Sequence, residues 1–181
     1  MLAVLSGSAP APRPRRGASY FLSGVMQGAR ASGDGFAGVV SQDYRAEIKA
    51  AVLAADGEAR VIDPWELIKP LAAELYPAGT ARDEMFHETA HVQRGLALVT
   101  EAAADADVVV SYLPEASMGS ALELHAARAK RRLVYVVAPG KMARNWVVVS
   151  HADRIFESIE QLAGWLRGGG AEGEGPAAGP S

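Results

Sequence analysis

Short runs of apolar residues alternate along this chain with longer segments in which apolar residues recur at helical spacing. Runs bounded by Gly, Pro or Asp are typical of buried strands, and the predicted strands are 18–24, 59–63, 107–113, 133–138 and a short run of valines at 147–149. The predicted helices are 41–53, 82–104, 120–130 and 155–166, whereas the segment that begins at Trp65 is predicted to be irregular. Apolar strands that alternate with helices indicate a parallel sheet covered on both faces. The sequence therefore predicts an α/β fold, a Rossmann-like (flavodoxin-like) parallel sheet of five strands with helices on both faces.

Composition limits the folded region and the partners. The length of 181 residues fits one domain, and we expect it to span 18–167, because the Pro- and Arg-rich 1–17 and the Gly-rich 168–181 are typical of disordered tails. The net charge of −3 offers no footprint for a nucleic acid polymer. The absence of cysteine excludes disulfides and thiolate chemistry and fits a reducing compartment. No apolar stretch approaches the roughly 20 residues that span a bilayer, and the N-terminal charges follow the apolar start instead of preceding it. We therefore expect a cytoplasmic protein without a membrane role.

The richest candidate loop for chemistry, residues 114–123, follows the third predicted strand. Ligands of open parallel sheets bind beyond the carboxyl ends of the strands. Ser117, Gly119 and Ser120 stand where the strand turns into a helix, so backbone N–H groups and hydroxyls can face an anion there. Glu123, on the first turn, would face the same space, and a carboxylate beside an anion suits cleavage of a glycosidic bond. The same residues also fit an ordinary helix cap with Glu123 complementing the helix dipole, and the pattern alone leaves both interpretations open.

The segment 113–124 resembles the signature of the nucleoside 2-deoxyribosyltransferase superfamily, and within it the nucleoside 5′-monophosphate N-glycosidases of the deoxynucleotide and CMP hydrolase type. That motif is Ser-x-Gly followed four residues later by Glu, a spacing that Ser117, Gly119 and Glu123 reproduce. The resemblance implies that Glu123 is the nucleophile and that Ser117 and Gly119 hold the 5′-phosphate of a nucleotide substrate. It implies neither a cofactor nor a metal.

The first strand and its loop, residues 20–30, are similar to the family's aromatic-x-x-Gly-x-x-Arg-Gly-Gly-Arg segment. The likeness implies that Phe21 stacks against the base or sugar and that Ser23 and Gly24 help to hold phosphate or sugar. Gln27 is also placed at the substrate, although the monophosphate hydrolases carry an Arg there that reads the sugar or phosphate.

Asn145, next to Trp146, resembles the segment that family members lend to the site of a neighbouring subunit. The resemblance therefore implies a homodimer or a higher homo-oligomer. Trp146 is the better candidate for a subunit contact or pocket wall, whereas Trp165, in the periodic last helix, is predicted to belong to the core.

One family residue lacks a counterpart. Family members place an Asp on the helix before the third strand, and counting back by the family spacing leads to Val99, or to Gly95 after a shift of one turn. Neither side chain can transfer a proton. The remaining candidates for an acid/base are Glu88, His91 and Glu101.

Three functions follow from these patterns. The first is an N-glycosidase, or a deoxyribosyltransferase, that acts on a nucleoside or its 5′-monophosphate through Glu123. The second is a nucleotide-binding or sensing protein of the same fold without turnover, which the missing Asp would explain. The third is a zinc-dependent hydrolase, because His87-Glu88-Thr89-Ala90-His91 matches His-Glu-x-x-His on a predicted helix, although no third ligand follows on a later helix.

Overall fold

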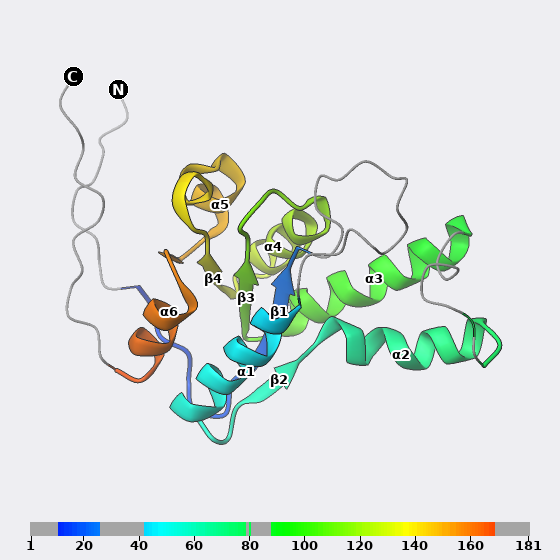
Figure 1. Ribbon diagram of the computed structural model, residues 1–181, viewed down its shortest axis with the longest axis horizontal. Coiled ribbons are helices and arrows are strands. Elements are labelled where there is room, and N and C mark those ends of the chain that lie inside the picture. Colours follow the sequence, from blue (N-terminus) through cyan, green and yellow to red (C-terminus); the bar gives the residue numbers. More distant parts are fainter. Residues whose placement is uncertain (1–10, 26–41, 79, 81–87, 169–181) are drawn as a thin grey trace.

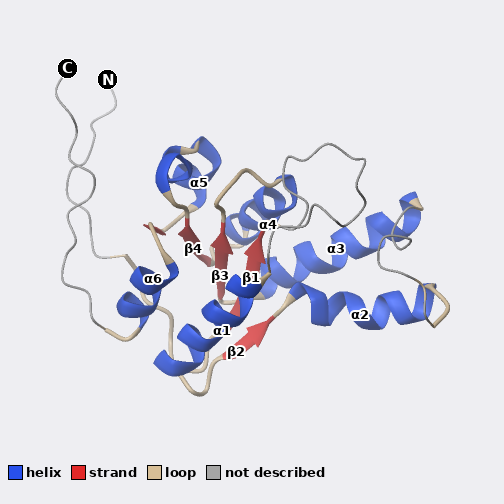
Figure 2. Cartoon of the chain, in the orientation of Figure 1, coloured by secondary structure: helices blue, strands red, loops and turns tan. Residues whose placement is uncertain are grey.

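The computed structural model describes residues 11–25, 42–78, 80 and 88–168 (Figures 1 and 2). The elements in chain order are β1 (Ser19–Gly24), α1 (Asp43–Ala55), β2 (Arg60–Ile62), α2 (Pro64–Leu75), α3 (Thr89–Asp105), β3 (Val108–Tyr112), α4 (Met118–Ala129), β4 (Leu133–Val137), the 3₁₀ helix η3 (Gly140–Arg144), α5 (Trp146–His151), β5 (Arg154–Phe156) and α6 (Ile159–Leu166). The strands form one sheet in the order β2-β1-β3-β4-β5, and every neighbouring pair is parallel. This is the flavodoxin-like order, so the predicted fold class is confirmed.

Helices cover both faces of the sheet, and the alternation of side chains along each strand decides which helices a residue meets. On β1, Tyr20 and Leu22 pack with residues of α1 and α6, whereas Phe21 between them packs with residues of α3 and α4. Ser23 and Ser111 face the same side of the sheet as Phe21, because they stand two residues after Phe21 and Val109 on their strands. Both hydroxyls therefore lie on the face that α4 covers.

The segment that begins at Trp65 is a helix, α2, and the prediction of an irregular segment is wrong. Asp63 caps the helix, since its Oδ1 accepts a hydrogen bond of 2.9 Å from the Trp65 N–H. Pro64 occupies the first turn, where its missing N–H has no intrahelical acceptor to lose. Pro70 lies inside the helix. The two prolines hid the helical pattern in the sequence, although an Asp cap followed by Pro is a favourable helix start.

The valines at 147–149 also belong to a helix, α5, and the fifth strand is β5 at Arg154–Phe156. Asn145 caps α5 by accepting a hydrogen bond of 2.9 Å from the Val147 N–H. Val148 is buried, while Val147 and Val149 are exposed. The cap and the packing of one helical face override the strand propensity of a β-branched run. The last helix consequently begins at Ile159, after the cap residue Ser158, and not at 155.

Residues 11–17, the described part of the N-terminal segment, pack against the domain that was predicted to begin at residue 18. The buried Tyr135 donates its hydroxyl to the Pro12 carbonyl at 2.6 Å, and the Gly17 N–H donates to Asp56 Oδ2 at 2.7 Å. After this segment, at the start of β1, the N–H and the hydroxyl of Ser19 both donate to Asp107 Oδ2, at 2.8 and 2.9 Å. These bonds lie at the amino ends of the strands. Among the helices of the described residues, none has the length and apolar character needed to cross a bilayer.

Candidate active site

The start of α4 has the geometry of a capped helix whose first N–H groups remain available. Ser117 Oγ accepts from the Ser120 N–H at 3.3 Å and from the Ser120 hydroxyl at 3.1 Å. The N–H groups of Met118 and Gly119 have no hydrogen-bond partner within the part of the chain that the structure describes. A Cβ added at Gly119 would meet nothing within 4 Å, so a ligand can approach this turn closely. Ser117 thus serves as a cap, and the exposed turn beside it keeps donors for an anion.

Glu123 is held by a chain of hydroxyls from two neighbouring strands. Its side chain is buried, with 8% of the residue exposed. Ser23 donates to Glu123 Oε2 at 2.5 Å, and Ser111 donates to Ser23 Oγ at 3.1 Å. Ser23 on β1 and Ser111 on β3 are register partners. In the strand order observed here, β1 and β3 flank the switch point at which flavodoxin-like folds bind their ligands.

Burial also sets the protonation of this carboxylate. Removal from water raises the pKa of Glu123 from 4.5 to about 7, while the hydrogen bond from Ser23 and the charge of Arg45 act in the opposite direction. Both protonation states are therefore populated near neutral pH. A carboxylate in this range can act as a nucleophile in its ionised form, and such shifts cluster at functional sites.

Arg45 is a buried residue of this region that sequence reasoning missed. Its side chain is 5% exposed, and Nη1 donates to the Leu22 carbonyl at 2.9 Å and lies 3.5 Å from Asp63 Oδ1. Its Nε donates to Gln42 Oε1 at 2.8 Å. The sequence did contain a signal, because Arg45 stands three residues before the buried Ile48 on the apolar face of α1.

Gly24, which was predicted to help hold phosphate or sugar, lies against a side chain of the protein itself. A Cβ at Gly24 would lie 2.3 Å from the Tyr44 hydroxyl oxygen. The Tyr44 ring stacks on Tyr112 with centroids 4.8 Å apart. Desolvation is the largest cause that raises the pKa of Tyr44 to about 12, so this hydroxyl stays protonated. A side chain at Gly24 would displace the Tyr44 ring from the end of β1.

Two other predicted residues have structural contacts of their own. Phe21 is fully buried in the cluster formed with Val99, Val109 and Leu124, so its ring presents no surface on which a base can stack. The Asn145 side chain caps α5, at the same edge of the sheet as Glu123. Gln27 lies outside the described residues.

The candidates for an acid/base are not brought to Glu123. His91 accepts or donates a hydrogen bond of 2.8 Å with the Tyr76 hydroxyl, and its Nε2 lies 3.8 Å from Glu88 Oε2. Both residues stand at the start of α3, which projects with α2 away from the sheet (Figure 1). Glu101 is exposed on the same helix. His87 lies outside the described residues, and those that are described contain no group of three His, Asp or Glu that could hold a metal.

Glu115 is a second carboxylate of the candidate loop that the sequence did not single out. Its Oε1 is buried and has no hydrogen-bond partner within the described chain. A buried carboxylate oxygen without a donor is costly, which favours an arrangement in which a ligand supplies one. No sequence pattern distinguishes this residue from an ordinary loop carboxylate.

Solved structures share this architecture. The chain aligns with a conserved protein from Enterococcus faecalis V583 with a TM-score of 0.52 and 14% identity, over 83% of this chain and 98% of that one. It aligns with a 2-deoxyribosyltransferase from Bacillus psychrosaccharolyticus with a TM-score of 0.53 and 14% identity, over 81% of this chain and 90% of that one. The three chains share one fold. No family model and no curated protein matches the sequence, so the likeness lies in the Rossmann-like architecture.

The buried carboxylate predicts a pH-dependent stability. Between pH 4.5 and about 7 the folded protein keeps a proton on Glu123 that the unfolded chain has released, so stability falls as the pH rises through this window. Glu123→Gln removes this loss, so its free energy of unfolding should exceed that of wild type by about 3 kcal/mol at about pH 8, with no advantage below about pH 4. Urea unfolding at a series of pH values measures both. Glu47→Gln, the same change at an exposed position of α1, should run parallel to wild type. Parallel curves for Glu123→Gln would contradict the burial of its charge.

Proposed function

We propose that this protein cleaves the N-glycosidic bond of a nucleoside or nucleoside 5′-monophosphate, or transfers the deoxyribosyl group, with Glu123 as the nucleophile. The observation that carries the proposal is a buried carboxylate with a pKa of about 7 at the β1–β3 switch point, beside a helix start with available N–H groups. The Ser-x-Gly-x-x-x-Glu spacing and a fold shared with a 2-deoxyribosyltransferase support the same chemistry.

In this proposal the two carboxylate oxygens of Glu123 have different roles. Ser23 donates to Oε2, whereas Oε1 has no hydrogen-bond partner within the described residues. Oε1 attacks the anomeric carbon, the bond from that carbon to the base nitrogen breaks, and the base leaves with the electron pair. Water then cleaves the glycosyl ester, or a second base accepts the sugar. The turn at Met118 and Gly119 would hold the phosphate of a monophosphate substrate.

A nucleotide-binding protein without turnover is the second candidate. The observation that favours it is Val99, which stands where the resemblance expects an Asp and is buried in the apolar cluster with Phe21. The helix therefore offers no proton donor at this position. Release of base, as opposed to binding alone, distinguishes the two candidates.

The proposal predicts that base release depends on Glu123. Single-turnover assays with a panel of nucleosides and 5′-monophosphates should show free base with wild type, and Glu123→Gln should reduce the rate by about three orders of magnitude or more, because the nucleophile is lost. Glu47→Gln is the matched control and should retain activity. Binding of a nucleotide without base release in wild type would support the non-catalytic candidate, and base release that survives Glu123→Gln would exclude this residue as the nucleophile.

The hydroxyl chain predicts a shift in the pH dependence of activity. Ser23→Ala removes a hydrogen bond that lowers the pKa of Glu123, so the pKa rises further and the ionised nucleophile forms only at higher pH. We expect the acid limb of the kcat/KM profile to move up by about one pH unit. Ser111→Ala is the control, because it keeps the Ser23–Glu123 bond and should move the limb less. An unchanged limb in Ser23→Ala would show that Glu123 ionisation does not govern the rate.

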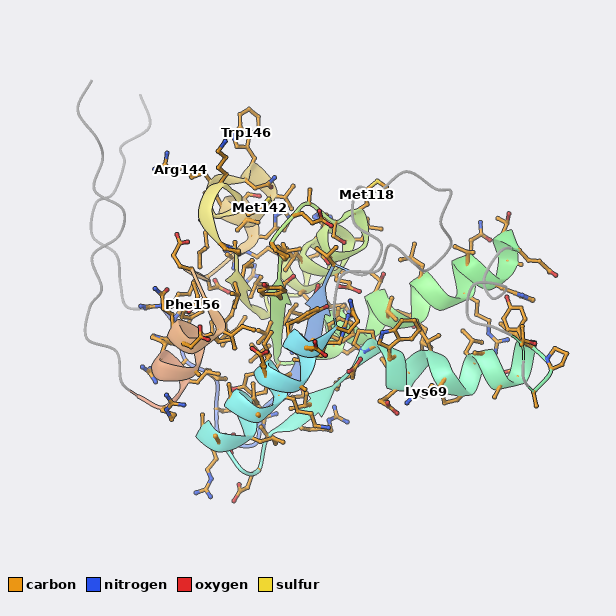
Figure 3. All side chains as sticks on the ribbon, in the orientation of Figure 1. Lys69, Met118, Met142, Arg144, Trp146 and Phe156 are labelled. Atoms are coloured by element: carbon orange, nitrogen blue, oxygen red, sulfur yellow. The ribbon has the colours of Figure 1, made fainter. Side chains whose placement is uncertain are left out.

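We infer further that the enzyme is a homodimer or higher homo-oligomer in which Asn145 contributes to a neighbouring site. The support is an apolar surface on α4 and α5 at the edge of the sheet that carries Glu123. Trp146 is 89% exposed and Met118 is 88% exposed. Figure 3 shows Trp146 projecting outward beyond α5. Exposed apolar side chains on adjoining helices are typical of an interface.

Complementation tests this arrangement. Asn145→Ser keeps an N-cap while removing the amide, and we expect it to be inactive alone, as Glu123→Ala is. When the two variants are mixed after mild dissociation, each mixed dimer contains one site with both an intact Glu123 and an intact Asn145, so activity should be partly restored. Mixtures without gain would contradict the shared site, and mixing Glu123→Ala with Glu123→Gln provides the blank.

A further inference from the structure

A cavity of about 420 Å³ lies at the amino ends of the strands, at the end of the sheet opposite Glu123. Its walls come from the N-terminal segment, the start of β1, the end of α1 and α6. Tyr20 lines it from the face that α1 and α6 cover, whereas Ser23 lies near the carboxyl end of the same strand and on the other face. The cavity is therefore separate from the candidate active site.

The lining is rich in positive charge. Arg13, Arg15 and Arg16 contribute to it, and Asp56 is the acidic residue among the lining side chains. Both oxygens of Asp56 already accept backbone hydrogen bonds, at 2.7 Å from the Gly17 N–H and at 3.0 Å from the Glu58 N–H. The carboxylate is thus occupied by neutral donors and compensates the guanidinium groups only in part.

Two of the three arginines are held by weak ion pairs. Arg15 lies 3.3 Å from Asp107 and Arg16 lies 2.8 Å from Glu58, and the two arginine side chains are 75% and 79% exposed. Exposed pairs of this kind contribute about 0–1 kcal/mol, so an anion in the cavity can compete for these guanidinium groups.

Arg13 is the cation most open to a ligand. Within the described residues it has no carboxylate partner, and its guanidinium carbon lies 4.5 Å from the centroid of the Trp165 ring. Stacking on the ring fixes the plane of the guanidinium while leaving its N–H donors free to bind an anion.

Tyr20 adds a donor that the fold does not use. The residue is 3% exposed, it lines the cavity, and its hydroxyl has no hydrogen-bond partner within the part of the chain described. Burial, with a smaller contribution from Asp56, raises the pKa of Tyr20 to about 12, so the hydroxyl keeps its proton. The hydroxyl faces the cavity, so it can donate to a bound acceptor without breaking a bond within the described part of the fold.

We propose that this cavity is a second ligand site, which binds a phosphate monoester through Arg13 and the Tyr20 hydroxyl, with Arg15 and Arg16 at its rim. Guanidinium groups match phosphate oxygens in charge and geometry, and a neutral hydroxyl completes the set of donors. The volume lies within the range of small-molecule sites and exceeds that of inorganic phosphate, so it leaves room for an organic group.

Isothermal titration calorimetry with phenyl phosphate tests the site. We expect saturable binding to wild type, and a loss of about tenfold or more in affinity in both Arg13→Gln and Tyr20→Phe, since each removes a hydrogen bond to a charged group. Tyr20→Phe keeps the ring in place and removes a hydroxyl on which the fold does not depend. Lys49→Gln, an exposed position of α1 that loses the same charge, should bind like wild type. Ser117→Ala, which alters the α4 turn, separates the two sites: binding that is lost in Ser117→Ala and kept in Arg13→Gln would place the phosphate at α4 and overturn the proposal.

Several outcomes would overturn the proposal. Binding that persists unchanged in Arg13→Gln and Tyr20→Phe, in protein whose thermal unfolding shows it to be folded, would place the ligand elsewhere. An equal loss in Lys49→Gln would reduce the effect to overall charge. Benzoate that binds as tightly as phenyl phosphate would contradict the phosphate assignment, and no saturation up to about 10 mM would exclude a specific site.

Discussion

The candidate active site depends on the cost of holding a carboxylate away from water. Glu123 reaches from α4 to the sheet, where the hydroxyl of Ser23 meets Oε2 and the hydroxyl of Ser111 meets Ser23 in turn. An isolated carboxylate in this position would cost several kcal/mol, and one strong hydrogen bond offsets only part of that. The part of this cost that the hydrogen bond does not offset raises the pKa of Glu123 to about 7. A buried carboxylate in this state suits the nucleophile proposed above, whereas capping a helix does not require one.

Strand alternation explains why these groups meet. Residues two apart on β1 and β3 face α4, and at the carboxyl ends of both strands this series reaches a serine. The intervening series faces α1, where Gly24 makes room for the Tyr44 ring and Tyr112 stacks on it. One face therefore carries hydrogen-bonding groups toward Glu123, and the other closes the end of the sheet with aromatic rings. The switch point between β1 and β3 lies at this end of the sheet.

The sequence predicted the parts of the fold that depend on periodicity. The strands predicted at 18–24, 59–63, 107–113 and 133–138 are observed as β1, β2, β3 and β4, and the Glu123 loop stands where a strand turns into a capped helix. Two predicted elements were wrong where a capping side chain determines the structure. Asp63 caps α2, which contains two prolines, and Asn145 caps α5, which contains three consecutive valines. Such local hydrogen bonds leave little trace in hydrophobic patterning.

The residues predicted for the site do not all lie together. Glu123 and Ser23 are in contact, whereas the core packing of Phe21 follows from its register on β1, which motif matching ignores. Arg45 was not singled out, although it lies on the apolar face of α1, and its bonds to Leu22 and Gln42 explain its burial. Contacts between residues distant in sequence determine these roles, and single-chain patterns do not contain them.

In the proposed reaction, the absence of a proton donor at Val99 limits the range of substrates. General acid catalysis typically contributes about 10²–10⁴-fold, so departure of an unprotonated base would be slow by that factor. In the proposed reaction Glu123 attacks the sugar as an ionised nucleophile, and it therefore cannot supply this proton. Glu115, with a buried and unpartnered Oε1 on the same loop, is a second carboxylate at this edge of the sheet. Unless such a group protonates the base, the site favours substrates whose base is already a good leaving group, because cleavage of the glycosidic bond then needs no acid.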